Sequence, residues 1–163
     1  RARAAELRCL QSQGTWRDLR YADRPAVITL LGPRNQRRHV ALLSLRGDNA
    51  VIEIDGREVE TTVAEIAPSW TGDFLLFWRA PDLFTRVMRY GHQGPDIEWL
   101  WQRLAAVDGQ DTTIEGAYFN NALAERIRAF QRQRGLAVDG IVGPHTMIQL
   151  NSATDQVGAP SLR

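Results

Sequence analysis

Four short runs rich in β-branched residues, each bounded by a turn signal, restrict the fold of this chain more than any other feature. The runs are AVITLL, HVALLSL, AVIEI and REVETTV between residues 26 and 63, and the segments between them read GPRNQ, RGDN and DG. β-Branched residues favour strands, whereas Gly, Pro, Asn and Asp favour tight turns. The pattern therefore predicts an antiparallel meander.

Other elements are expected on both sides of the meander. The segment TVAEIAP after it predicts a short helical turn, and the apolar run FLLFW from Phe74 to Trp78 closes the first half of the chain. Before the meander, Ala4, Leu7 and Leu10 recur at helical spacing, and Gly14 is a suitable left-handed stop. We therefore predict a helix over residues 1–14.

The second half of the chain has a different pattern. The segment RAPDLFTRVMRYGHQGP has prolines and glycines near both ends and no alternation, which is typical of a linker between two units. Three amphipathic segments follow, and each has one apolar helical face. These faces are Ile97, Leu100, Trp101 and Leu104; then Phe119, Leu123, Ile127 and Phe130; then Met147 and Leu150. Three short helices of this kind can share one small core.

The stretch FQRQRGLAVDGIVGPHTM predicts a corner between the second and third of these helices. Asn120 is expected to cap the second helix, Gly135 to end it, and Pro144 to stand at the first position of the third helix. The pair Asp139-Gly140 is typical of a tight turn. The apolar residues of the loop are expected to contact the core, and they are Leu136, Val138, Ile141 and Val142.

Composition and charge exclude several classes of function. The formal charge of the 163 residues is +1, with no basic stripe of the kind that binds nucleic acid. No apolar run approaches membrane length, so we expect no membrane contact in this fragment. One cysteine excludes an internal disulfide. The three histidines, His39, His92 and His145, have no metal-like spacing, and we expect neither a metal nor a cofactor.

The second half resembles the type 1 peptidoglycan-binding domain, a three-helix module. The resemblance rests on FQRQRGLAVDGIVGPHT and on spaced positions before and after it, which are Gly94, Ile97, Leu100, Leu104, Gly116, Phe119 and Leu150. A joint match of this many spaced positions is more specific than a short motif. Trp101 departs from the pattern, because the family usually has glutamine there.

The first half also resembles a known family. The segments GTWRDLRYADRPAVITLL, RHVALLSLRGDNAVIEIDG and APSWTGDFLLFWRAP are similar to the C39-peptidase-like region of the general secretion pathway protein A (ExeA) family, in which it precedes the wall-binding module. The order of the two halves and the ending GAPSLR are similar too. The resemblance implies an upstream ATPase domain and membrane span, so that this fragment of an inner-membrane protein faces the periplasm. It also implies a partner, general secretion pathway protein B.

We therefore expect an α+β chain with a degenerate papain-like, C39-like antiparallel β domain followed by a three-helix peptidoglycan-binding module. The expected boundaries are 1–80 for the N-terminally incomplete β domain, 81–93 for the linker, 94–152 for the module and 153–163 for a tail. The chain begins without methionine inside a periodic segment, which suggests a piece of a longer protein.

A cysteine, a histidine and an aspartate invite a catalytic hypothesis, with Cys9 as nucleophile, His39 as base and Asp55 as the group that orients the imidazole. His39 and Asp55 fall where the resemblance places the peptidase histidine and aspartate. Cys9 lies toward the C-terminal end of its predicted helix, where the helix dipole disfavours a thiolate. We therefore interpret Cys9 as a buried structural thiol, His39 as a strand residue and Asp55-Gly56 as a hairpin turn, and expect no catalytic residue.

A wall ligand offers sugar rings, which prefer flat apolar faces, and carboxylates, which prefer arginines and backbone donors. The residues that could supply these contacts lie on or near the corner. They are Trp99, Trp101, Gln131, Arg134, Asp139, Gly140 and Thr146.

The two resemblances imply a non-catalytic, periplasmic, peptidoglycan-binding part of a type II secretion assembly protein, which helps secretin assembly through the cell wall. Weak binding by one copy favours an oligomeric full-length protein, because repetition along the wall adds avidity. Two alternatives stay open. One is a fragment of a C39-like cysteine peptidase whose nucleophile lies upstream, and the other is the targeting module of a cell-wall hydrolase.

Overall fold

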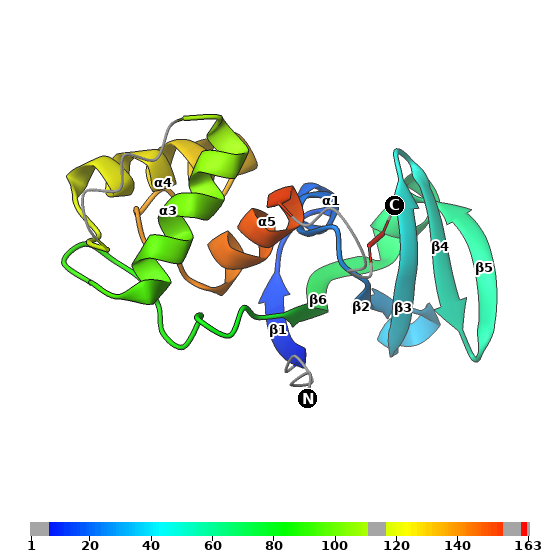
Figure 1. Ribbon diagram of the computed structural model, residues 1–163. Helices are drawn as coiled ribbons and strands as arrows, with labels where there is room; N and C mark the ends of the chain where they lie inside the picture. The colour runs from blue at the N-terminus through cyan, green and yellow to red at the C-terminus, as the bar shows by residue number, and fades with distance from the viewer. Residues whose placement is uncertain (1–6, 111–116, 155–160, 163) are drawn as a thin grey trace. The chain divides into compact units, whose positions relative to one another are not determined.

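The computed structural model describes residues 7–110, 117–154 and 161–162. These residues form two compact units (Figure 1). The first unit comprises residues 7–78 together with 161–162, and the second comprises the described residues from 79 to 154. Each unit is described by itself below.

The first unit is built on a six-stranded sheet with the strand order β1-β6-β2-β3-β4-β5 (Figure 1). Strands β2 to β5 pair antiparallel in chain order, which confirms the predicted meander. Strand β6 pairs antiparallel with β2 and separates it from β1. The strands are β1 (Leu7–Gln13), β2 (Ala26–Leu31), β3 (Arg37–Arg46), β4 (Asn49–Ile54), β5 (Arg57–Thr62) and β6 (Trp70–Arg79).

The core of the first unit follows the alternation along these strands, because successive side chains of a strand point to opposite faces. Ile28 of β2 and Leu42 of β3 are fully buried, and Phe74 and Leu76 of β6 are nearly so. The Asp55-Gly56 pair makes the turn between β4 and β5, with φ values of 52° and 76°. This confirms the expected hairpin turn.

Short helices complete the first unit. Helix α1 (Trp16–Ala22) was not expected from the sequence; it begins after a capping box between Thr15 and Asp18. Helix α2 (Val63–Ile66) confirms the predicted helical turn, and two 3-10 turns cover Pro33–Asn35 (η1) and Ala67–Ser69 (η2).

The capping box of α2 sets the ionisation of Glu65. Its carboxylate accepts hydrogen bonds from the Thr61 hydroxyl at 2.8 Å and the Thr62 amide at 3.0 Å. These bonds, of which the Thr61 bond has the largest effect, lower the pKa of Glu65 below its ordinary value. The stability that they add is therefore present above the ordinary glutamate pKa and is lost as pH falls through the lowered one.

The predicted helix over residues 1–14 is wrong over the part that the structure describes. Residues 7–13 form strand β1, while residues 1–6 lie outside the described residues. Leu7 is 58% exposed, so the apolar spacing does not mark a buried helical face. The structure favours a strand because β1 pairs beside β6, and the Gly14 amide donates to the Gly72 carbonyl at 3.0 Å. This nonlocal pairing outweighs a weak local helix preference.

The second unit contains helices α3 (Pro95–Asp108), α4 (Asn121–Arg134) and α5 (Pro144–Thr154) (Figure 1). All three predicted apolar faces are buried, which confirms the helical periodicity except at Phe119. This residue lies two residues before α4 begins, so it is buried from the preceding loop. The exposed fraction does not exceed 8% for any residue of these faces: Ile97, Leu100, Trp101, Leu104, Phe119, Leu123, Ile127, Phe130, Met147 and Leu150.

The predicted helix ends of α4 are also confirmed. The Asn120 side chain accepts from the Leu123 amide at 2.9 Å, and Gly135 is left-handed with φ 68°. Two predictions for the following loop are wrong, because Val138 is 44% exposed and Ile141 is 36% exposed. The prediction for Val142 is confirmed, because this residue is fully buried.

The segments expected to be a linker and a tail both make ordered contacts. Phe84 and Met88, in the segment before α3, are 4% and 1% exposed. Leu162, near the C-terminus, is 1% exposed in the first unit, where its amide donates to Asp23 Oδ1 at 3.1 Å and its carbonyl accepts from the Leu45 amide at 2.7 Å.

Candidate functional site

The corner between α4 and α5 is organised by the side chain of Gln131, which is 1% exposed. Its amide nitrogen lies 2.8 Å from Asp139 Oδ1, 2.9 Å from the Ile141 carbonyl and 3.2 Å from Thr146 Oγ1. Its amide oxygen accepts from the Gly140 amide at 2.9 Å. One buried side chain therefore holds both sides of the loop.

Four of the predicted ligand residues thus come together in space, as the sequence suggested: Gln131, Asp139, Gly140 and Thr146. They bind one another. Thr146 is 4% exposed, and Asp139 Oδ1 also accepts from the Ile141 amide at 2.8 Å. The polar atoms in these contacts build the loop, while the Asp139 residue is exposed.

A side chain at Gly140 would be strained, mainly by the backbone conformation. Its φ is +72°, a value that favours glycine, and an added Cβ would lie 3.1–3.2 Å from the guanidinium of Arg128. Arg128 is itself held by Glu125 at 2.6 Å. The glycine thus permits both the turn and the close approach of an arginine.

The two predicted tryptophans of α3 differ in exposure. Trp101 is 8% exposed, its Nε1 donates to the Tyr118 carbonyl at 3.3 Å, and Arg126 Cζ lies 5.1 Å from its ring centroid. Its ring is therefore part of the interior. Trp99 is half-buried, and Arg103 Cζ lies 5.1 Å from its ring centroid, a cation–π distance.

Arg134, at the end of α4, is the predicted cationic contact. It is half-buried, and its Cζ lies 5.4 Å from the centroid of the Phe130 ring. Trp99 and Arg134 are thus the predicted ligand side chains that combine partial exposure with a cation–π pair.

The catalytic hypothesis fails on geometry. Cys9 lies on β1 and His39 on β3, and β6 and β2 lie between these strands. Three strand spacings amount to about 14 Å, far beyond the ~3 Å contact that a thiol–imidazole pair requires. The interpretation of Cys9 as a buried thiol is also wrong, because Cys9 is exposed on the edge strand β1.

His39 and Asp55 lie toward the same end of β3 and β4. The last paired residues at this end are Ala41 of β3 and Glu53 of β4. His39 lies two residues before Ala41, and Asp55 lies two residues after Glu53. His39 is exposed, and its Nδ1 lies 3.1 Å from Thr29 Oγ1. Asp55 is exposed in the hairpin turn.

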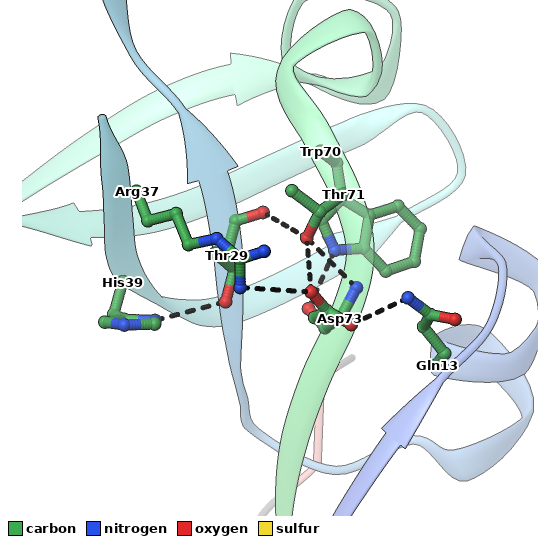
Figure 2. A network of polar contacts seen from close by, with 7 residues as sticks. All are labelled: Gln13, Thr29, Arg37, His39, Trp70, Thr71 and Asp73. Atoms are coloured by element: carbon green, nitrogen blue, oxygen red, sulfur yellow. Dashed lines mark hydrogen bonds and ion pairs between the residues drawn. The ribbon is translucent and has the colours of Figure 1, made fainter. Parts of the chain in front are cut away.

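Sequence reasoning missed a polar network across four strands, which Figure 2 shows. Asp73 of β6 is at its centre and accepts from Gln13 Nε2 at 2.9 Å and from Thr71 Oγ1 at 3.1 Å. The Thr71 hydroxyl also lies 3.1 Å from the Thr29 carbonyl, and Arg37 Nη1 lies 4.0 Å from the Asp73 carboxylate (Figure 2). These contacts join β1 and β6 to β2 and β3, so their role is to hold the sheet together.

Two further properties concern cofactors and membranes. Within the described ranges, no three His, Cys, Asp or Glu side chains gather so that they could hold a metal ion. Across the same part of the chain, no helix is both long enough and apolar enough to cross a membrane.

The second unit, which we call the helical unit, contains a segment that matches a known family model. Residues 93–150 match the family model described as "Putative peptidoglycan binding domain". The match begins two residues before α3 and ends within α5. The class defined by fold and sequence together is thus a two-unit α+β protein whose helical unit matches a peptidoglycan-binding domain.

Two proteins similar to this chain bear the name of the general secretion pathway. The chain is 26% identical over 148 residues to general secretion pathway protein A of Aeromonas hydrophila, covering 90% of this chain and 27% of that protein. It is 33% identical over 82 residues to a putative general secretion pathway protein A of Escherichia coli K12, covering 50% of this chain and 16% of that protein. The chain therefore spans about a quarter or less of these relatives.

A solved structure agrees with these relatives. The crystal structure of a periplasmic domain of the EpsAB fusion protein of the Vibrio vulnificus type II secretion system matches with a TM-score of 0.56 and 27% identity, covering 94% of this chain and 67% of that chain. Together the comparisons confirm the resemblance to the periplasmic region of general secretion pathway protein A. The C39-like character of the first unit stays a prediction.

Proposed function

We propose that this chain is a non-catalytic periplasmic part of a type II secretion assembly protein, and that its helical unit binds peptidoglycan. The observation that carries the proposal is the coincidence of the family match over residues 93–150 with a folded unit whose predicted core faces are all buried. The names of the relatives support the secretion context.

The finer parts of the proposal concern the full-length protein. We infer that it has an upstream ATPase domain, forms a homo-oligomer in the inner membrane, works with general secretion pathway protein B and helps the secretin assemble through the wall. We also infer that the first unit is a degenerate C39-like domain and that α3, α4 and α5 form the family's three-helix module. The similarity of both units, in the same order, to one secretion protein supports this inference.

The chain is expected to cleave no peptide. The reason is the separation of Cys9 from His39 by three strand spacings, about 14 Å. Incubation with peptide libraries and analysis by mass spectrometry checks this. Cys9 is exposed, so a thiol-reactive probe will label it, and the labelled chain provides a second check on any cleavage. Cleavage that disappears in Cys9→Ser would show that the proposal is wrong.

The chain is expected to sediment with purified peptidoglycan sacculi at low salt. Arg134→Ala should weaken this binding without unfolding the unit, and added salt should weaken it further if a carboxylate is the partner. Arg132→Ala is the matched control, because Arg132 is an exposed arginine of the same helix. Binding by one copy should be weak, since a shallow, solvated surface offers few buried anchors.

The decisive comparison uses an artificially oligomerised form of the chain, which adds avidity. If the folded wild-type chain stays in the supernatant with sacculi even in that form, peptidoglycan binding is refuted. The helical unit would then be a protein–protein interaction domain.

A further inference from the structure

The segment before α3 is held against the two loops that precede α4 and α5. Met88 and Val142 exchange backbone hydrogen bonds of 3.2 and 2.9 Å as an antiparallel bridge. Further along, the Phe119 amide donates to the His92 carbonyl at 2.8 Å, and the Gly91 amide donates to the Phe119 carbonyl at 3.0 Å. Backbone hydrogen bonds therefore hold together three segments that are distant in sequence.

These bridges decide which side chains face outward. Met88 and Val142 are 1% and 0% exposed, so both point into the core. In extended backbone, adjacent side chains point to opposite sides. Accordingly, Val87 and Ile141 face outward, with exposed fractions of 46% and 36%.

Two tyrosines of these segments are also partly exposed. Phe119 is fully buried, and its neighbour Tyr118 is turned the other way and is half-buried. The Tyr118 ring meets the ring of Tyr90 edge to face, with centroids 6.4 Å apart and planes at 69°. Tyr90 is 58% exposed, so a large part of an aromatic ring stands in solvent.

The unit buries the apolar faces of all three of its helices, whereas Tyr90, Val87 and Ile141 stay exposed. A ligand that covered these three side chains would remove apolar surface from water. An aromatic face with a hydroxyl at its edge suits a sugar ring, which has apolar C–H faces and polar rims. Arg89, between Val87 and Tyr90, is exposed and can pair with a carboxylate. Arg86 is already committed, because its Nε lies 3.0 Å from Asp96 Oδ2.

We propose that Tyr90 and Tyr118 form a surface that binds the glycan strand of peptidoglycan, with Arg89, next to Tyr90, available for a carboxylate of an attached stem peptide. We call this set the tyrosine surface. The inference rests on the proposed wall binding and adds the part of the ligand that is recognised. It also places recognition beside the α4–α5 corner, whose polar side chains are occupied with one another.

The test compares binding to sacculi by the wild-type chain, the double variant Tyr90→Ser/Tyr118→Ser and the double variant Tyr90→Phe/Tyr118→Phe. The serine pair should bind about 2-fold to 10-fold more weakly for each ring that contributes to stacking, while the phenylalanine pair should bind almost normally. Phe77→Ala is the matched control, because Phe77 is a 38% exposed aromatic residue of the first unit. The Trp101 Nε1 bond uses the Tyr118 carbonyl, so it does not depend on that side chain.

Two soluble competitors distinguish recognition of the glycan from recognition of the stem peptide. Glycan chains freed of stem peptides should compete with sacculi for the wild-type chain, and free stem peptides should compete poorly. Should the stem peptides compete and the glycan fail, the tyrosine surface is not a glycan site. If wild type binds sacculi and the folded serine pair binds equally, the inference is wrong while wall binding stands. If wild type itself does not bind, wall binding fails first.

A measurement on the unaltered chain covers the case in which the serine pair does not fold. Hydroxyl-radical footprinting with saturating sacculi should protect Tyr90, and Phe77 should react as it does without sacculi. Equal reactivity of Tyr90 with and without bound sacculi would overturn the inference.

Discussion

Phe130→Ala is expected to lower the free energy of unfolding of the helical unit by about 3–5 kcal/mol, because it removes a large buried ring and leaves a cavity. Phe130 is 4% exposed and lies on the apolar face of α4. Arg134 Cζ lies 5.4 Å from the centroid of the Phe130 ring. The loss therefore combines hydrophobic burial with a cation–π contact.

Circular dichroism at 222 nm during thermal and urea unfolding measures the effect, since α3, α4 and α5 supply most of the helical signal. The two units need not unfold together, so the helical signal is analysed separately from tryptophan fluorescence. Arg132→Ala, an exposed change on the same helix, should alter stability by no more than about 0.5 kcal/mol. A Phe130→Ala melt that superimposes on the wild-type melt would contradict the core described here.

Gln131→Glu is expected to disrupt the corner although it changes one group of similar size. A glutamate cannot donate to Asp139 Oδ1 or to the Ile141 carbonyl when it is ionised, and it places a second negative charge beside Asp139. Buried groups that lose their partners cost about 1–3 kcal/mol each. Ionising a group that is 1% exposed adds a further penalty.

This penalty depends on pH in a defined direction. Burial and the nearby Asp139 carboxylate raise the pKa of the introduced carboxyl group in the folded variant above the ordinary glutamate value of about 4.3. The penalty is complete above the raised folded-state pKa and disappears as pH falls toward the unfolded-state value. The gap between variant and wild-type unfolding curves should therefore narrow as pH falls from about 7 to about 5. Gln133→Glu, an exposed change two residues away, is the matched control and should show neither effect.

The local parts of the fold were predictable because their causes lie within a few residues. The meander follows from alternation and from turn residues such as Asp55-Gly56, where φ is positive. The ends of α4 follow from Asn120, which caps its own first turn, and from Gly135, which accepts a left-handed conformation at no steric cost. Each of these features uses contacts within one turn or one hairpin.

The errors come from contacts between distant parts of the chain. Residues 7–13 have a weak helical pattern, and they form β1 because β6, much later in the chain, provides a partner for pairing. Ile141 and Val142 both read as core residues, and only Val142 is buried, because it bridges to Met88. Spacing alone cannot tell which of two adjacent apolar residues faces inward.

The candidate site also has a part that the sequence predicted and a part that it did not. Its residue types were visible in the sequence, and the corner formed by Gln131, Asp139, Gly140 and Thr146 does assemble. The burial of Gln131 and Thr146 was not visible, because it depends on how the loop packs against both helices. The tyrosine surface was missed since Tyr90 and Tyr118 meet through backbone pairing across a segment expected to be a linker.

The sequence by itself thus determined the meander, the helix faces, the ends of α4 and the resemblance to a wall-binding module, all of which depend on local periodicity and on residue types that permit particular backbone angles. Tertiary structure alone decided the strand at residues 7–13, the distance between Cys9 and His39, and the exposure of the tyrosines. The physical reason is that burial and strand pairing are relations between distant residues. Local propensities are small enough, below about 1 kcal/mol per residue, for such pairings to override them.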